Sequence, residues 1–178
     1  PFYVFVLPDR ATYNKFGDDY GEDHSSFYGS FYAPSHPQRP VAVEWSDNKV
    51  LMQMHITHSV VHPYLAAAYP QTLGQRPLWL EEGLAAYFAY YWAPEWCTQT
   101  YLKAKAENKV GAVTSMFKFA PRNWQQASDY YLLQLGVFFD YLIRLRPDTM
   151  SKPDSSGKMR GPFRDYLVSV LDGSGTGG

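Results

Sequence analysis

The chain of 178 residues has little cysteine and no excess of charge of either sign, and each shortage excludes a class of protein. Its single cysteine, Cys97, cannot form a disulfide within the chain, which excludes a fold built on disulfides. The 16 basic and 17 acidic residues almost cancel, and no basic block occurs. Because a nucleic-acid-binding protein needs a positively charged surface, we expect no nucleic acid among the partners.

Long apolar runs are also missing. No stretch of about 18 or more apolar residues occurs, so the sequence predicts no transmembrane segment in this piece. With 46% hydrophobic residues, the chain nevertheless has enough apolar side chains for one buried core. We predict a single domain over residues 1–172, followed by a flexible Gly- and Ser-rich tail over residues 173–178.

Strand patterns lie near the N-terminus, and helical patterns occupy most of the remaining chain. β-Branched and aromatic residues predict strands over 2–7, 27–33 and 40–45, of which the last two form a hairpin with a long connection. Apolar periodicity predicts a helix from residue 47 or 48, and further helices over 77–91, 94–108, 124–145 and 162–171. The expected fold class is α+β, with a small mixed or antiparallel sheet packed on a mainly helical domain.

Two histidines lie four residues apart in the first of these long helices. At about 100° per residue, His58 and His62 share one helix face with His55 and Ser59. Two histidines at this spacing can bind one zinc ion, and a carboxylate from a second helix can add a third ligand. Pro63 predicts a kink or break near His62, because proline lacks the backbone N–H that a helix uses.

A carboxylate of this kind occurs in the segment Trp79-Leu80-Glu81-Glu82-Gly83-Leu84-Ala85. The segment is otherwise apolar, and burying a carboxylate is costly unless it is paired or bound to a metal. Its glycine and alanines also allow another helix to approach closely. The combination of the two segments favours a metal site.

Together these segments resemble the gluzincins, zinc metallopeptidases of the peptidase MA-like group, in which HExxH is followed on the next helix by Trp-Leu-x-Glu-Gly-Leu-Ala. The resemblance implies a zincin-like domain that binds zinc through His58, His62 and Glu82 and takes a polypeptide as substrate or ligand. It also favours an extracytoplasmic location, either periplasmic or secreted. Only residues 58–88 match the family pattern specifically.

Ser59 departs from the family pattern, because it replaces the glutamate that serves as general base. A serine hydroxyl accepts no proton from water at neutral pH, and loss of a general base costs about 10²- to 10⁴-fold in rate. We therefore expect hydrolysis to be weak or lost. Three explanations remain open: a natural pseudo-enzyme, an inactivating substitution, or a different residue acting as base.

Two neighbouring residues are accessory candidates. Glu81 is expected to cap the helix, pair with Arg76 or face solvent rather than act as the base, because it lies about 100° around the helix from Glu82. His55 is the stronger candidate for a fourth ligand or a base, since it lies one turn before His58.

The resemblance implies two further sets of residues. Val41, Val43 and Glu44 lie on a strand that the family uses as the sheet edge on which an extended peptide is laid. Tyr130 and Tyr131 are candidates for the tyrosine that faces the metal and stabilises the transition state, although simple packing is the commoner role for tyrosines in a chain that has 15 of them. Two alternatives stay open: a non-catalytic module that binds a polypeptide or a cell-envelope component, and a structural domain with accidental histidine spacing.

Overall fold

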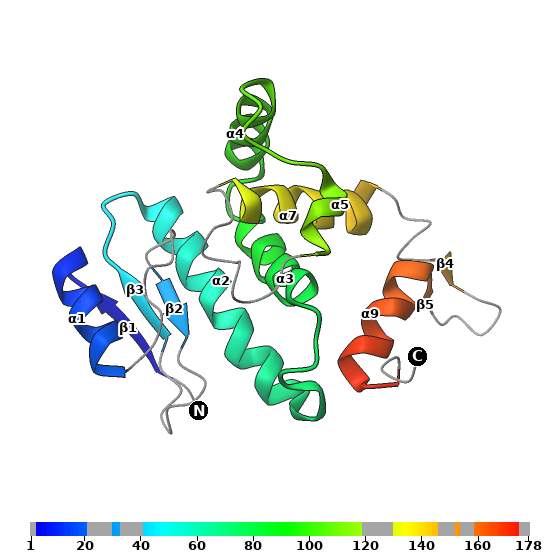
Figure 1. Ribbon diagram of the computed structural model, residues 1–178, viewed down its shortest axis with the longest axis horizontal. Coiled ribbons are helices and arrows are strands. Elements are labelled where there is room, and N and C mark those ends of the chain that lie inside the picture. The colour runs from blue at the N-terminus through cyan, green and yellow to red at the C-terminus, as the bar shows by residue number, and fades with distance from the viewer. Residues whose placement is uncertain are drawn as a thin grey trace.

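The computed structural model describes residues 3–20, 30–32, 41–118, 130–145, 152–153 and 159–174. A small sheet lies at one end of the molecule and helices form the remainder (Figure 1). The sheet region consists of β1 (Val4–Leu7), α1 (Arg10–Tyr20), β2 (Ser30–Tyr32) and β3 (Val41–Glu44). The main helices that follow are α2 (Lys49–Ala68), α3 (Leu78–Tyr90), α4 (Pro94–Ala106), α5 (Val113–Met116), α7 (Tyr131–Asp140) and α9 (Pro162–Asp172).

Short elements connect these helices. The turn η1 (Pro70–Thr72) is a 3-10 helix, and η2 (Tyr141–Leu145) continues α7 as a π-helical turn. The strands β4 (Lys152–Pro153) and β5 (Met159–Arg160) form a two-stranded antiparallel sheet before α9. In the described part of the chain, no helix combines the length and apolar character needed to cross a membrane.

The main sheet has the strand order β1-β3-β2. β1 runs parallel to β3, with Val4 opposite Val41, whereas β2 runs antiparallel to β3, with Phe31 opposite Ala42. The chain is thus mainly helical with a small mixed sheet, as the α+β prediction requires. The purely antiparallel arrangement is wrong, because β1 joins the sheet in parallel across a crossover that contains α1.

The implied role of Val41, Val43 and Glu44 as a sheet edge is also wrong, because β3 is the central strand. Val41 and Val43 are 0% exposed and pack towards Met52 and Ile56 of α2. The intervening Ala42 packs on the opposite face, against α1. Helices therefore cover both faces of β3 (Figure 1). Among the described strands, β2 is the edge strand that contacts α2.

Helix α2 continues through Pro63, so the predicted break near His62 does not occur. Asn48 caps its N-terminus by accepting hydrogen bonds from the backbone N–H groups of the next turn, at 3.1 and 3.2 Å. Pro63 itself is buried, between the buried Val61 and Leu65. An interior proline costs about 3 kcal/mol relative to alanine. We attribute the continuity of α2 to its packing against α3 and the sheet, which offsets this cost.

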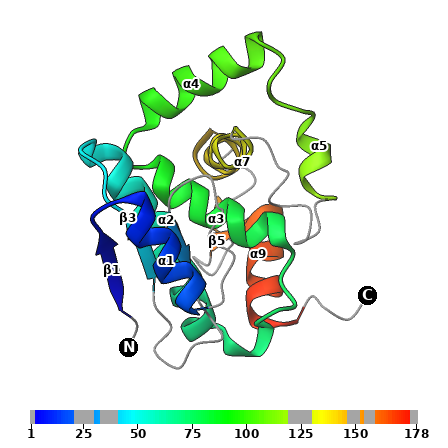
Figure 2. The ribbon, with the colours of Figure 1, turned by 60° about the vertical axis from the view of Figure 1, so that its left-hand side comes forward.

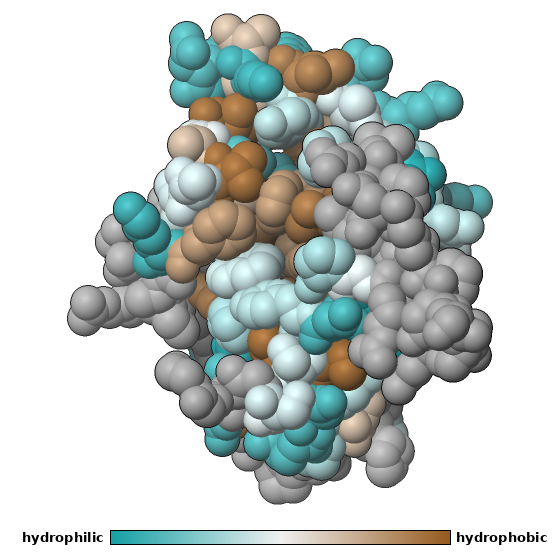
Figure 3. All heavy atoms as spheres, turned by 90° about the vertical axis from the view of Figure 1, so that its right-hand side faces the viewer, coloured by the Kyte–Doolittle hydropathy of each residue, from teal (hydrophilic) through white to brown (hydrophobic). Residues whose placement is uncertain are grey.

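Helices α3 and α7 form the centre of the helical region. Figure 2 looks along α7, around which α3, α4, α5 and α9 are arranged. The core between them contains Leu80, Met116, Leu135 and Phe139, all 0% exposed. On the face shown in Figure 3, hydrophobic side chains gather in the upper half, towards the end of the molecule formed by α4, and the lower half is mainly hydrophilic. The helices thus bring α2 and α3, which carry the predicted ligands, together next to α4 and α7.

Candidate metal centre

Three of the predicted ligand side chains converge between α2 and α3. His58 Nε2 lies 3.5 Å from His62 Nε2 and 3.2 Å from Glu82 Oε2, and His62 Nε2 lies 3.8 Å from Glu82 Oε1. The three side chains are between 12% and 14% exposed, so they are shielded but reachable from solvent. Among the described residues, His58, His62 and Glu82 form the group of His, Cys, Asp and Glu side chains with metal-site geometry.

The spacing of these atoms fits a tetrahedral zinc site. Ligand atoms at about 2.0–2.2 Å from a tetrahedral zinc lie about 3.3–3.6 Å from one another. The observed separations of 3.2, 3.5 and 3.8 Å bracket that range. Two nitrogens and one carboxylate oxygen are also a donor set that zinc accepts.

Glu81 holds the ring of His62 from the side away from His58. Its Oε1 lies 3.2 Å from His62 Nδ1, and its Oε2 accepts a hydrogen bond from Arg76 Nε at 3.1 Å. A carboxylate at Nδ1 favours the proton there, so in the neutral ring Nε2 carries the lone pair that a metal needs. Of the three alternatives expected for Glu81, the structure shows the pairing with Arg76, and its contact with His62 was not anticipated.

Arg76 connects the two ligand-bearing helices. Its side chain is 1% exposed, and its Nη1 donates to the carbonyl of Tyr69 at 3.1 Å and to Thr72 Oγ1 at 3.0 Å. Tyr69 closes the C-terminal end of α2, whereas Glu81 lies in the first turn of α3. The guanidinium thus fixes the end of one helix to the start of the other.

The charges in the centre support one another. Burial raises the pKa of Glu82. The neighbouring His62 and His58 lower this pKa by more than burial raises it, so it lies below its ordinary value. For His62, burial lowers the pKa, and the charge of Glu82 and the hydrogen bond with Glu81 outweigh burial and raise it. Glu82 is therefore ionised at neutral pH, the state that a metal ligand needs.

The residue at the position of the general base is inaccessible. Ser59 is 2% exposed, so its hydroxyl has almost no contact with solvent. His55 lies outside the three-residue donor group, which gives no support to its role as a fourth ligand. Burial, assisted by the charges of His58 and Arg10, lowers the pKa of His55 to about 4, so the ring is neutral at neutral pH.

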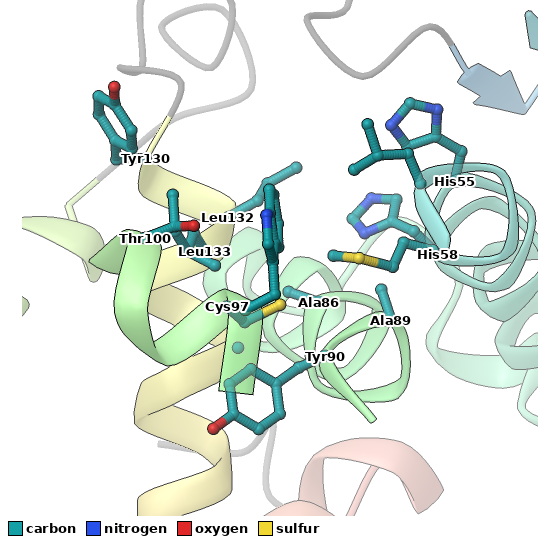
Figure 4. A pocket seen from close by; sticks show the side chains of 14 residues that line it. His55, His58, Ala86, Ala89, Tyr90, Cys97, Thr100, Tyr130, Leu132 and Leu133 are labelled. Atoms are coloured by element: carbon teal, nitrogen blue, oxygen red, sulfur yellow. The ribbon is translucent and has the colours of Figure 1, made fainter. Parts of the chain in front are cut away.

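The two candidate tyrosines occupy different places. Tyr131 is 5% exposed and belongs to the core between α3 and α7, where burial raises the pKa of its hydroxyl. Tyr130 lines the same pocket as His58, but on the opposite wall, with its hydroxyl directed away from that histidine (Figure 4). The ring of Tyr130 also lies 5.7 Å from Lys109 Nζ. In this structure the hydroxyl of Tyr130 therefore does not point at the donor group, and the burial of Tyr131 in the core favours a packing role for its side chain.

The sequence reasoning missed a pocket of about 360 Å³ between α2, α3, α4 and α7. His55 and His58 form part of its wall, so it adjoins the metal centre. The available signal was the pair of small residues, Ala86 and Ala89, at a helical spacing of three on α3.

Comparison of the chain with protein-family models, with curated proteins and with solved structures found no match. The function is therefore argued from the geometry of the metal centre and the adjoining pocket.

Proposed function

We propose that the chain is a zincin-like domain that binds one zinc ion through His58, His62 and Glu82, and that its peptide hydrolysis is weak or lost because Ser59 occupies the position of the general base. The observation that supports this proposal best is the convergence of three donor atoms from two helices at separations of 3.2–3.8 Å. Those separations suit tetrahedral zinc.

The residues around the donor group support the same function. When bound, zinc supplies Lewis-acid polarisation of a carbonyl group and lowers the pKa of water. Glu81 and Arg76 fix the ring of His62, so the Nε2 atom is oriented before a metal arrives. Ser59 contributes a buried hydroxyl, which takes up no proton at neutral pH. The arrangement therefore suits metal binding better than it suits hydrolysis.

Metal analysis tests the binding part of the proposal. We expect about one zinc per chain after incubation with zinc and gel filtration, and loss of that zinc in His58→Ala, because each histidine supplies one of three protein ligands. His55→Ala is the matched control, since it removes a neighbouring histidine outside the donor group. A wild-type protein that stays metal-free would overturn the proposal.

Substitution at position 59 tests the catalytic part. Ser59→Glu supplies the missing base, and we expect it to raise hydrolysis of a casein substrate by about 10²- to 10⁴-fold over wild type. Ser59→Gln is the control, because it has the same shape without a base. Equal activity of the two variants, with zinc bound and the fold intact by circular dichroism, would show that Ser59 is not what limits hydrolysis.

A second candidate function is non-catalytic binding of a polypeptide or a cell-envelope component on the same scaffold. It is favoured by Ser59 together with the pocket beside His58, since binding an apolar group requires no metal. Peptide binding in the presence of EDTA, combined with no zinc uptake, would select this function over the first. The extracytoplasmic location stays a prediction that rests on the family resemblance.

A further inference from the structure

The C-terminal end of α9 lies against η1, the turn that follows α2 (Figures 1 and 2). The carbonyl oxygen of Leu171, in the last turn of α9, accepts a hydrogen bond from Gln71 Nε2 at 3.2 Å and lies 3.3 Å from Thr72 Oγ1. A carbonyl in the last turn of a helix has no partner within that helix, so it needs a donor from elsewhere. The turn η1 supplies that donor.

The hydroxyl of Thr72 has contacts on two sides. Thr72 is 1% exposed, and its Oγ1 accepts a hydrogen bond from Arg76 Nη1 at 3.0 Å. Its own hydrogen faces two carbonyl oxygens, that of Leu171 at 3.3 Å and that of Tyr69 at 3.2 Å. A hydroxyl donates one hydrogen bond while it accepts another. Thr72 therefore joins Arg76 to the end of α9 and to the end of α2.

The guanidinium of Arg76 extends this connection to Glu81. Its Nε donates to Glu81 Oε2 at 3.1 Å, on the side opposite the contact of Nη1 with Thr72. Among the described residues, Nη2 of Arg76 is buried without a hydrogen-bond partner, so the contacts of Nε and Nη1 fix the group. The donors of a guanidinium have fixed directions in one plane, so a rotation that displaces Nη1 also displaces Nε.

Glu81 connects Arg76 to the ring of His62. One carboxylate oxygen accepts from Arg76, and the other lies 3.2 Å from His62 Nδ1. The two oxygens belong to one rigid group, so the direction of Oε1 towards the ring depends on how Arg76 holds Oε2. A continuous series of contacts between 3.0 and 3.3 Å thus runs from Leu171 through Thr72 to His62.

We propose that Thr72 is a positioning residue of the metal centre. Through Arg76 and Glu81, its hydroxyl fixes the ring of His62 with the proton on Nδ1, and the end of α9 holds that hydroxyl in place. The use of Nε2 by a metal rests on the proposed function, whereas the effect on the ring rests on the contacts alone. The competing role of Thr72 is to close η1 through the Tyr69 carbonyl, which requires no effect on His62.

The first measurement is the tautomer of His62 in metal-free protein, from the nitrogen-15 shifts of labelled histidine in alkaline buffer with EDTA. Thr72→Val has a similar shape without the hydroxyl, and we expect it to move His62 from the Nδ1–H towards the Nε2–H tautomer. Thr72→Ser restores the hydroxyl and is expected to keep the wild-type tautomer. Gln71→Ala is the matched control, because it removes the other hydrogen bond to the Leu171 carbonyl and leaves the contact of Thr72 with Arg76 in place.

The second measurement is zinc affinity, from competition with a fluorescent chelator. We expect Thr72→Val to weaken zinc binding by about threefold to tenfold, less than the 10- to 100-fold loss typical of a direct partner of a ligand. Thr72→Ser and Gln71→Ala are expected to bind zinc as wild type does. Thr72→Ala, with a smaller side chain, covers the case in which Thr72→Val does not fold, and we expect it to change the tautomer in the same direction.

The outcomes separate this inference from the zinc proposal. A wild-type tautomer in folded Thr72→Val or Thr72→Ala would overturn the inference. An equal change of tautomer in Gln71→Ala would also overturn it, since the anchoring of α9 in general would then position the ring. A wild-type protein that takes up no zinc, combined with an altered His62 tautomer in Thr72→Val alone, would refute the zinc site and support the role of Thr72.

Discussion

At the scale of single residues, the proposed metal centre depends on the contact between Glu81 and His62. The carboxylate oxygen lies 3.2 Å from Nδ1, on the side of the ring away from the donor group. A hydrogen bond at Nδ1 fixes both the tautomer and the rotation of the ring. The position of His62 Nε2 therefore depends on a residue that does not itself belong to the donor group.

Glu81→Gln tests that dependence. We expect it to weaken zinc binding by about 10- to 100-fold, because the amide holds the ring less firmly and makes it less basic. A competition titration against a fluorescent zinc chelator gives the affinity. Glu95→Gln, in the exposed first turn of α4, is the control for removal of one negative charge. If the Glu81→Gln protein bound zinc as tightly as the control, Glu81 would have no role in positioning His62.

His55 gives the protein a pH dependence that can be isolated. Its pKa is about 4 in the folded chain, against an ordinary value of 6.5, because of burial and the charges of His58 and Arg10. Between these values the unfolded chain binds a proton that the folded chain does not, so stability falls as pH falls from 6.5 to 4. Above the ordinary value both states are neutral, and this contribution to stability is fully present.

We expect His55→Gln to lose less stability than wild type between pH 7.5 and pH 4.5 in EDTA. The difference is at most about 3 kcal/mol, at 1.36 kcal/mol per pKa unit, and partial exposure of the ring reduces it. Urea unfolding at the two pH values measures it. Parallel pH profiles for the two proteins would show that the histidine is protonated equally in the folded and unfolded states.

At the scale of elements, the close contact of α3 with α7 fixes the position of Glu82. Gly83 follows the ligand directly, and a Cβ at this position would overlap the ring of Phe139, which is 0% exposed. Replacing a glycine inside a helix by alanine normally raises the free energy of unfolding by about 1 kcal/mol. Here overpacking costs about 1–3 kcal/mol, because the ring of the fully buried Phe139 would have to move.

Gly83→Ala is therefore expected to lower the free energy of unfolding, against the helix propensity of alanine, and to weaken zinc binding as α3 shifts. Denaturant unfolding and the zinc titration measure the two effects. Gly111→Ala serves as control, because its added methyl meets only the hydroxyl of Ser115 at 3.3 Å, which can rotate away. A Gly83→Ala protein more stable than wild type would contradict the account of this contact.

Local patterns predicted the elements that depend on local chemistry. Asp9 caps α1 by accepting a hydrogen bond from the Thr12 N–H at 2.7 Å, and aspartate directly before a helix is a common N-cap. The antiparallel pair of β2 and β3 also follows from two apolar runs. The donor group was predictable because the spacing of His58 and His62 places both on one face of a helix.

Features that depend on distant segments were not predictable from such patterns. The parallel pairing of β1 makes β3 central, and no local pattern along Val41–Glu44 encodes that neighbour. The contact of Glu81 with His62 depends on how α2 and α3 cross, and the pocket depends on which residues of α4 and α7 face Ala86 and Ala89. The predicted helix over 124–145 is confirmed from Tyr131 onward, and its residues 124–129 lie outside the described part. The single-domain boundary at 172 stays a prediction, with α9 ending at Asp172.

At the scale of the whole molecule, the proposed zinc site would couple metal binding to folding, because its three donor residues come from two helices. The unfolded chain does not hold His58, His62 and Glu82 together, so zinc at the proposed site would bind the folded state preferentially. Free zinc at 100 times its dissociation constant is therefore expected to raise the free energy of unfolding by about 2.7 kcal/mol. Chemical unfolding with zinc and with EDTA measures this difference.

The same experiment on His58→Ala separates the site from other effects of zinc. Loss of one of three protein ligands removes most of the preferential binding, so zinc and EDTA are expected to give the same unfolding curve. His55→Ala keeps the donor group and is expected to retain the zinc effect. If His58→Ala were stabilised as much as wild type, zinc would bind the folded chain elsewhere, and the link between the donor group and the stability of the fold would be lost.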